Sequence, residues 1–486
     1  MSAAGRIDAG QGGGSRSRTA VAGRGGAARL ARTGALAAAV LLAGLLPSGA
    51  GEAAPPAEAS QSEAIAADLV RFAHAAVDRI EQRGRTAYIY EATTGGAGLE
   101  PEVHLRARLP VSFTDCSGWV NYLLAVVTPP HQAVLARHRL TPRFNTGVVD
   151  EAAQPWARAM VIYDYLRQQP EAAPAADGGF RRIADFRRLR PGDIAAWCLG
   201  GWCEPQTLKK LPDTDTGHTF VVVGHPRRVS PNTGGYRGVS DGVATLDPGA
   251  AGVIAVPVID SSSLRHFDDS RNFRHVPRDA PPTSVPGGLG SGELWFAVDV
   301  HGAPLQMRFS RADAYFPNRR SPGAVRFAAG RPTARIDLAG PLVVAPYSDA
   351  VSQLAGRSYG ALPVRLGGRG RLTIGRDARL RLTGTSSFVG GVVVEERATL
   401  SVERDGAFGA ATNPVVLGGR IELGAGFAGS AERTLKSRAG GLLATSGRTS
   451  WKGPLEGRAL AVDVVGRLTL RALGVTVSGR RTLDLR

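Results

Sequence analysis

Apolar positions recur at helical spacing in three stretches of the first third of the chain. Residues 63–82, EAIAADLVRFAHAAVDRIEQ, predict an amphipathic helix. Residues 117–127 are apolar on more sides and predict a second, more buried helix. Residues 151–168 predict a third helix, with Pro155 in its first turn, where proline is tolerated.

The period then changes from that of helices to that of strands. Short runs rich in apolar and β-branched residues are bounded by Gly, Pro and Asp, which predicts a half-buried antiparallel sheet. Helices followed by strands predict an α+β domain over residues 63–305. The runs are DIAAWCL (193–199), HTFVVVG (218–224), GVIAVPVID (252–260) and ELWFAVDV (293–300).

The C-terminal part has a third pattern. Residues 361–486 alternate short β-branched strands with Gly and Asn-Pro turns, which predicts the stacked rungs of an all-β solenoid. The stretch LTGTSSFVGGVVVEERATLSVERDGAFG resembles the passenger repeat of bacterial autotransporters and implies a right-handed β-helix. The residues that carry this resemblance are Gly384, Phe388, Gly390, Gly391, Asp405, Gly406 and Gly409. Residues 306–360 are Arg-rich and are left as a linker or an uncertain segment.

The N-terminus has the pattern of an export signal. Residues 1–33 carry six Arg and one Asp, and the 13-residue apolar run GALAAAVLLAGLL follows at 34–46. Such a run is short for a membrane span, so we interpret residues 1–50 as a signal peptide and 51–62 as a linker. An uncleaved signal anchor is the alternative. We therefore expect a periplasmic or secreted protein.

Three cysteines fit an oxidising compartment. Cys198 and Cys203 flank Gly200 and Gly201 and are expected to close a small disulfide loop. A two-cysteine metal site is the alternative, but there is no second Cys pair to complete it. Pairing these two leaves Cys116 as the lone thiol, and an odd cysteine in an exported protein is worth attention.

Cys116 lies in TDCSGWV, residues 114–120, at the start of the second predicted helix. Thr114 or Asp115 would cap this helix, whose first N–H groups would face a thiolate, and Trp119 would wall a cleft. Cys116 could also simply be a packed core residue. His218 begins a predicted strand, and Asp260 ends the next one, so the pair could serve as general base and its orienting group. The rival candidates are His225 for the base and Ser261, His266 and Asp268 for the orienting group.

These segments resemble the NlpC-type family of papain-like cysteine peptidases, which act on bacterial cell walls. The matching motifs are DCSGWV, LRPGDIAAW at 189–197, and TGHTFVVV, with Asp260 third. The resemblance implies a papain-like fold and a Cys116–His218–Asp260 triad that cleaves amide bonds of peptidoglycan stem peptides. Two features depart from the family. Cys116 and His218 are 102 residues apart because of an insertion at 125–188, which could cover the cleft, and RARLPVSF (106–113) lacks the family's oxyanion Tyr. Tyr88 and Tyr90 lie further upstream.

The net charge of +17 is compatible with anionic envelope polymers as partners, and also with an ordinary solvated Arg-rich surface. The Arg clusters lack interleaved aromatic residues, so nucleic acid is not an expected partner. GGLGSG at 287–292 is followed by no Lys-Ser/Thr, so a phosphate loop and a nucleotide cofactor are not expected. No cofactor or metal is predicted. The alternatives to a cell-wall hydrolase are an acyltransferase or toxin effector on the same fold, and a non-catalytic surface adhesin.

Overall fold

The computed structural model describes most of the chain between residues 57 and 485. The predicted signal peptide lies outside the described residues. The described segments are 57–89, 102–105, 108–172, 178–210, 216–231, 246–271, 273–278, 280, 284–310, 313, 315–316, 325–338, 340–344, 353–354, 357–358, 361–362 and 364–485.

In the described segments four α-helices precede the main sheet, and two of the three predicted helices lie close to their expected bounds. Helix α1 begins six residues early and so takes up half of the predicted linker 51–62. Helix α3, inside the insertion, was not predicted. The helices are α1 (Ala57–Arg83), α2 (Cys116–Val127), α3 (Pro129–Arg139) and α4 (Ala159–Gln168).

The predicted helix at 151–168 was wrong in its first half. Only Ala159–Gln168 is helical, and the preceding residues form turns. The reason is a buried ion pair between Glu151 and Arg158, which closes this segment across seven residues. Arg158 itself is extended, with φ −72° and ψ 170°, and it precedes the first helical residue. The charge pair therefore overrides the helical apolar spacing.

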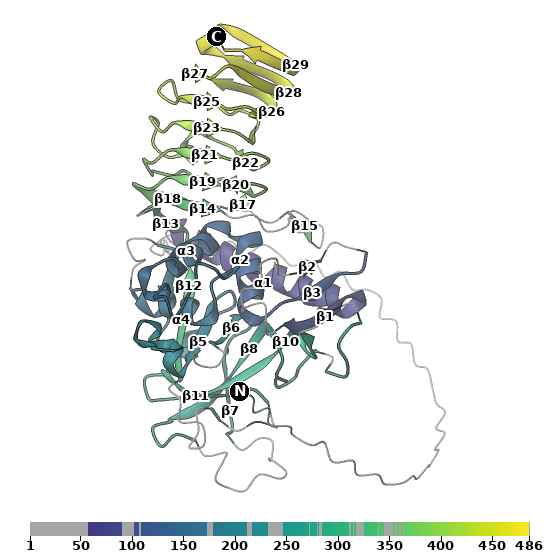
Figure 1. The fold of residues 1–486 in the computed structure, drawn as a ribbon, viewed down its shortest axis with the longest axis vertical. Coiled ribbons are helices and arrows are strands. Elements are labelled where there is room, and N and C mark those ends of the chain that lie inside the picture. Colours follow the sequence, from purple (N-terminus) through teal and green to yellow (C-terminus); the bar gives the residue numbers. More distant parts are fainter. Residues whose placement is uncertain are drawn as a thin grey trace, which may run out of the picture. The chain divides into compact units, whose positions relative to one another are not determined.

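The main sheet has eight strands, all antiparallel, in the order β11-β10-β8-β6-β5-β12-β4, with β7 paired to β8 (Figure 1). Helix α2 contacts β6 and β8, and α4 contacts β5 and β12, so the insertion forms part of the core. The strands are β4 (Phe180–Arg182), β5 (Ile194–Leu199), β6 (Gly217–Val222), β7 (Arg227–Val229), β8 (Gly252–Ser262), β10 (Gly288–Val298), β11 (Pro304–Arg308) and β12 (Val325–Pro332).

The centre of this sheet is buried on both faces, so the expected half-buried sheet was wrong. On one face Val221 and Ile259 pack with the helices, and on the other Phe220 and Val258 pack with aromatic side chains. Burial on both faces explains why the predicted strands read as continuous apolar runs and lack a strict alternation. The polar residues that do occur in these strands are therefore exceptional.

The sheet also extends past residue 305, where the sequence placed the end of the domain. Strand β12, Val325–Pro332, pairs with β5 along six residues and with β4 on its other side. This strand could not be predicted from the Arg-rich sequence, because polar and apolar residues are mixed along it without a clear period. Part of the segment left as a linker therefore belongs to the sheet.

A second, four-stranded sheet lies next to the start of α2. Its strand order is β2-β3-β1-β9, and β1 runs parallel to β3. Because β3 leads directly into α2, this pairing brings β1 beside Cys116. The strands are β1 (Arg85–Ile89), β2 (Glu102–His104), β3 (Val111–Phe113) and β9 (Ser284–Val285).

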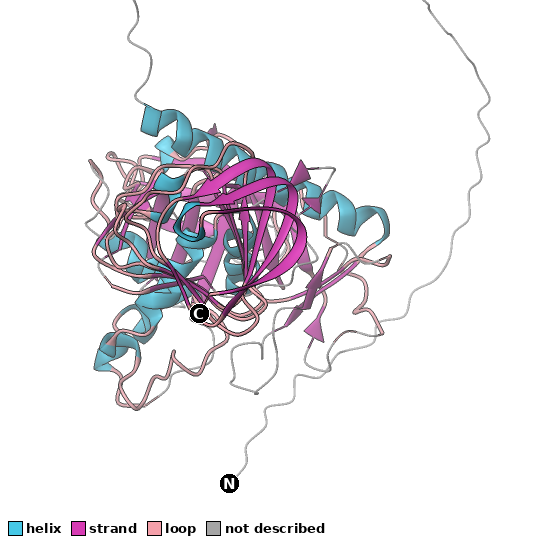
Figure 2. Ribbon diagram, turned by 90° about the horizontal axis from the view of Figure 1, so that it is seen from above, coloured by secondary structure: helices cyan, strands magenta, loops and turns pink. Residues whose placement is uncertain are grey.

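The predicted β-solenoid is confirmed, and its parallel strands begin at residue 335, before the predicted start at 361. Two stacks of parallel strands run through it, β14-β19-β21-β23-β25-β27 and β17-β20-β22-β24-β26-β28, and β13 pairs with β18 (Figures 1 and 2). Strand β29 closes the second stack in the antiparallel direction. The strands are β13 (Arg335–Leu338), β14 (Leu342–Val344), β15 (Gln353–Leu354), β16 (Arg357–Ser358), β17 (Ala361–Leu362), β18 (Arg365–Gly368), β19 (Leu372–Ile374), β20 (Arg379–Leu382), β21 (Val392–Val394), β22 (Thr399–Val402), β23 (Val415–Leu417), β24 (Arg420–Leu423), β25 (Leu435–Ser437), β26 (Leu442–Trp451), β27 (Leu455–Glu456), β28 (Ala459–Leu470) and β29 (Val475–Asp484).

A buried arginine joins neighbouring turns of the solenoid. The Arg433 side chain has no exposed surface, and its guanidinium donates to both carboxylate oxygens of Asp405 at 2.8 and 3.0 Å. It also donates to the carbonyl oxygens of Asn413 and Gly409 and lies 5.3 Å from the centre of the Phe408 ring. The Asp-Gly turn of the repeat is therefore fixed by a charge supplied from the next turn.

We predict that Arg433→Met destabilises the solenoid by about 3 kcal/mol, because it leaves a half-buried carboxylate and several carbonyl groups without their donor. The free energy of unfolding in denaturant measures this. Arg397→Met is the matched control, since Arg397 also pairs with an aspartate, Asp377, but on the exposed surface. Equal stability of the two variants would contradict the role given to Arg433.

Candidate active site

The first turn of α2 is built around an aspartate cap. The Asp115 carboxylate accepts hydrogen bonds from the Gly118 backbone N–H at 2.6 Å and from the Ser117 hydroxyl at 2.9 Å. Asp115 is thus the N-cap, and Cys116 is the first residue of the helix. This location directs the first N–H groups and the positive end of the helix dipole toward the space around the Cys116 sulfur.

The insertion contributes Trp156 to the same turn. The indole N–H of Trp156 donates to the Ser117 hydroxyl at 3.0 Å. A Cβ at Gly118 would lie 2.8 Å from the Trp156 ring and 2.2 Å from the Thr114 hydroxyl, so only glycine fits. The expectation that Trp119 walls a cleft was wrong, because Trp119 is fully buried and stacks on Tyr122 at 6.0 Å. The motif DCSG therefore describes a packed helix start.

His218 reaches this turn from the start of β6. Its Nε2 lies 2.5 Å from Asp260 Oδ2, and the carbonyl oxygen of Gly217, the residue before it, lies 4.0 Å from the Cys116 sulfur. Since Nε2 is engaged by Asp260, Nδ1 is the nitrogen left for the thiol. The ring also lies 4.8 Å from that of Trp197 on the paired strand β5, which limits its rotation.

Neighbouring charges stabilise the ionised forms of His218 and Asp260. Burial alone would lower the pKa of His218, but Cys116 and the Asp260 carboxylate raise it to about 10. Burial alone would raise the pKa of Asp260, but Arg271, His266 and His218 hold it well below its usual range. An ionised aspartate behind a protonated imidazole is the arrangement that stabilises a thiolate–imidazolium pair.

The three residues predicted for the site, Cys116, His218 and Asp260, are therefore brought together. All are buried, and 4% of Cys116 and 7% of His218 remain exposed. Of the rivals, His266 joins the site and bonds to Asp260. Ser261 donates to the Thr114 carbonyl at 2.6 Å and so ties β8 to the segment before α2. Asp268 and His225 are exposed and take no part in these contacts.

Two residues of the site were not assigned a role from the sequence, although Tyr88 was noted as an upstream tyrosine. The hydroxyl of Tyr88, on β1, lies 4.0 Å from the Cys116 sulfur. The parallel pairing of β1 with β3 places Tyr88 there, and a separation of 28 residues gave no local signal. The second is Arg271, which bonds to Asp260 and comes from a loop without periodicity. Tyr90 lies outside the described residues.

Ligand atoms of His218, Asp260 and His266 all lie within 4.8 Å of one another, a spacing that could suit a metal ion. The nitrogen–oxygen distances of 2.5 and 2.9 Å, however, are those of direct hydrogen bonds. Two ligands of a tetrahedral zinc ion are roughly 3.3 Å apart. The Arg271 guanidinium already balances the carboxylate, so the residues fit a hydrogen-bonded cluster better than a metal centre.

The expected disulfide between Cys198 and Cys203 is present, with Cα atoms 5.2 Å apart, and Cys116 is a free cysteine. Among the described residues, no helix combines the length and apolar character that crossing a membrane requires.

Comparisons of the chain with known family models, with curated proteins and with solved structures gave no match.

Two buried histidines should titrate in opposite ways. His218 has a pKa of about 10, whereas burial lowers the pKa of His131 to about 4 despite its hydrogen bond to the Thr333 carbonyl. We predict that between about pH 5 and 8 His218 stays an imidazolium and His131 stays neutral. NMR of ring-labelled histidine measures both, with His218→Gln and His131→Gln to assign the signals.

The raised pKa of His218 also predicts how the stability of the folded protein changes with pH. The folded-state pKa of His218 lies above the value of 6.5 for an exposed histidine. Its imidazolium therefore contributes stability that is fully present below pH 6.5 and is lost as the pH rises through about 10. A His218 signal that titrates near neutral pH would contradict the charge arrangement described here.

Proposed function

We propose that the protein is a cysteine amidohydrolase of papain-like type, with Cys116 as nucleophile, His218 as general acid and base, and Asp260 as the group that orients His218. The observation that carries the proposal is the convergence of three segments at the first turn of α2. His218 bonds to Asp260, and the Gly217 carbonyl, next to His218 in the chain, lies 4.0 Å from the Cys116 sulfur. A packed core cysteine needs neither a capped helix start nor a charged histidine beside it.

The reaction follows from this geometry. The Cys116 thiolate attacks an amide carbonyl and forms a carbon–sulfur bond, and the carbon–nitrogen bond breaks as the His218 imidazolium gives its proton to the leaving amine. Neutral His218 then takes a proton from water, which attacks the thioester. The carbon–sulfur bond breaks, the acid product leaves, and the thiolate–imidazolium pair is restored.

Negative charge on the carbonyl oxygen has two donors within reach. One is the backbone N–H of Cys116 at the helix start, which has no partner within its own helix. The other is the Tyr88 hydroxyl, close to the sulfur on the neighbouring strand. Tyr88 thus takes the place of the tyrosine that the sequence lacked just upstream of Cys116.

Peptidoglycan stem peptides are the substrate class that we propose, and the periplasm or the cell exterior is the location. The resemblance of the site motifs to NlpC-type peptidases, the signal-like residues 1–50, the disulfide and the net charge of +17 support this. We further propose that the solenoid is a right-handed β-helix that serves as a stalk or a surface for binding wall polymer.

The test is digestion of purified peptidoglycan, with release of new amino groups and soluble peptides as the readout. We expect the wild-type protein to release both and Cys116→Ala to lower kcat by at least about 10⁴-fold, because removing a nucleophile removes the covalent route. His225→Gln, an exposed position that takes no part in the site contacts, should retain full activity. Peptide release that continues in Cys116→Ala would rule out the proposed nucleophile.

A further inference from the structure

The loop of residues 264–271 follows β8 and runs along an edge of β10. Strand β11 pairs with β10 only from Trp295 onward, so the earlier part of that edge is left to the loop. The backbone N–H of Phe267 donates to the Glu293 carbonyl at 3.2 Å, and the Glu293 N–H donates to the Phe267 carbonyl at 2.8 Å. The Ser270 N–H donates to the Ser291 carbonyl at 2.9 Å. The loop is therefore held in register with the sheet.

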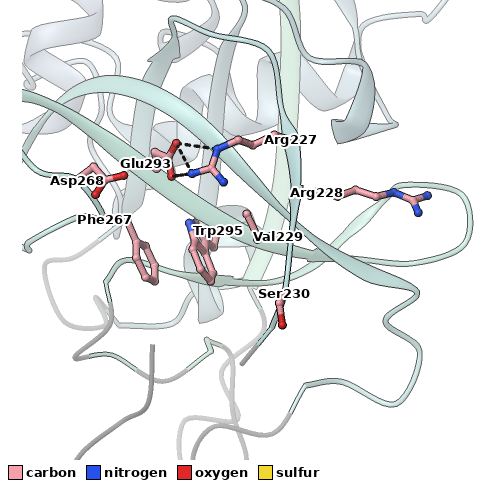
Figure 3. Close-up of a pocket in the computed structure, with 8 residues that line it drawn as sticks. All are labelled: Arg227, Arg228, Val229, Ser230, Phe267, Asp268, Glu293 and Trp295. Carbon is pink, nitrogen blue, oxygen red and sulfur yellow. Dashed lines mark hydrogen bonds and ion pairs between the residues drawn. The ribbon is translucent and has the colours of Figure 1, made fainter. Parts of the chain in front are cut away.

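Neighbouring side chains of this loop point to opposite faces of the sheet, as they would in a strand. Phe267 stacks on Trp295, with ring centres 4.0 Å apart and planes inclined by 6° (Figure 3). On the other face, His266 Nε2 lies 2.9 Å from Asp260 Oδ2, and its Nδ1 lies 3.1 Å from the Leu264 carbonyl. The aromatic stack on the outer face thus fixes the position of His266 on the inner face.

Arg271 ends the loop with no exposed side-chain surface. Its guanidinium bonds to Asp260 Oδ1, to the Asp260 carbonyl at 2.9 Å and to the Gly290 carbonyl at 2.9 Å. It also donates to the Gly288 carbonyl and to Asp269, at 2.8 and 3.0 Å. Arg271 and His266 therefore occupy the two oxygens of Asp260, and His218 shares the second oxygen with His266.

The glycines of GGLGSG make room for these two side chains. Gly290 lies directly opposite Asp260 across the β8–β10 pairing, and a Cβ on it would lie 2.4 Å from Arg271 Cγ. A Cβ on Gly292 would lie 2.6 Å from His266 Cβ. Neither glycine has a positive φ, so space, and not backbone conformation, requires glycine at both positions.

We propose that His266 and Arg271 are positioning residues that hold the Asp260 carboxylate in the one orientation that keeps His218 against Cys116, and that Gly290 and Gly292 serve this same role. The inference rests on the proposed function. Without these donors, Asp260 would turn away from His218, and the imidazolium would lose its support beside the thiol.

The first variant changes the space around Arg271 without removing a polar group. Gly290→Ala places a methyl group against Arg271, whereas Ser291→Ala, its matched control, lies on the opposite face of the same strand. A second pair is His266→Gln, of similar size but with no ring, and Asp268→Asn, an exposed position of the same loop with φ 48° that asparagine tolerates. If Gly290→Ala does not fold, His266→Gln alone tests the positioning role.

The measured quantity is the rate of Cys116 alkylation by iodoacetate divided by the rate with iodoacetamide. An imidazolium beside the sulfur attracts the anionic reagent, so this ratio reports the His218–Cys116 pair and does not depend on a substrate. We expect Gly290→Ala and His266→Gln to lower the ratio about ten-fold, and the two controls to match the wild type. Circular dichroism and thermal unfolding establish that each variant is folded.

The outcomes separate the two proposals. If folded His266→Gln or Gly290→Ala retains the wild-type ratio, the positioning role is overturned while the proposed function stands. If the wild-type ratio equals that of His218→Ala, there is no charged pair to position, and both proposals fail. A ratio lowered equally in Ser291→Ala would also overturn the inference, because it would show a general response of β10.

Discussion

A carboxylate with no exposed surface must be surrounded by donors, and the arrangement of this site follows from that requirement at Asp260. Its three donors come from two segments: His218 on β6, and His266 and Arg271 on the loop after β8. The neighbours of these donors fit around them. Trp197 packs against His218, Gly290 leaves room for Arg271, and Gly292 leaves room for His266. A change at any of these positions acts on the orientation of His218.

The second element of the site is the start of α2, which is fixed independently of Asp260. The Asp115 cap and the Trp156 indole hold the first turn, and the Ser261 hydroxyl connects the preceding segment to β8. The strand that carries Asp260 therefore also holds the backbone next to Cys116. This common support keeps Cys116 and the Asp260 carboxylate in a constant relation, which the proposed catalysis requires.

Site residues that lie in a recognisable local motif could be predicted from the sequence. Site residues that reach the site through the register of strand pairing could not. Cys116, His218 and Asp260 each lie within two residues of the start or end of an element whose period is readable. Arg271 lies in a loop without periodicity, and its contact depends on the pairing of Gly290 with Asp260. Tyr88 depends on a parallel strand pairing, and the turn at 151–158 on a buried ion pair. The solenoid was predictable because its alternation repeats at every turn, although its first strands were missed.

The most direct test of the account is native labelling of the full chain with an electrophilic thiol probe at about pH 7, followed by peptide mapping with mass spectrometry. We expect rapid labelling of Cys116 in the folded wild-type protein and a loss of most of that reactivity in His218→Ala, with the fold of both established by circular dichroism. Labelling of Cys116 only after denaturation would contradict the account, because it would make this cysteine a packed core residue.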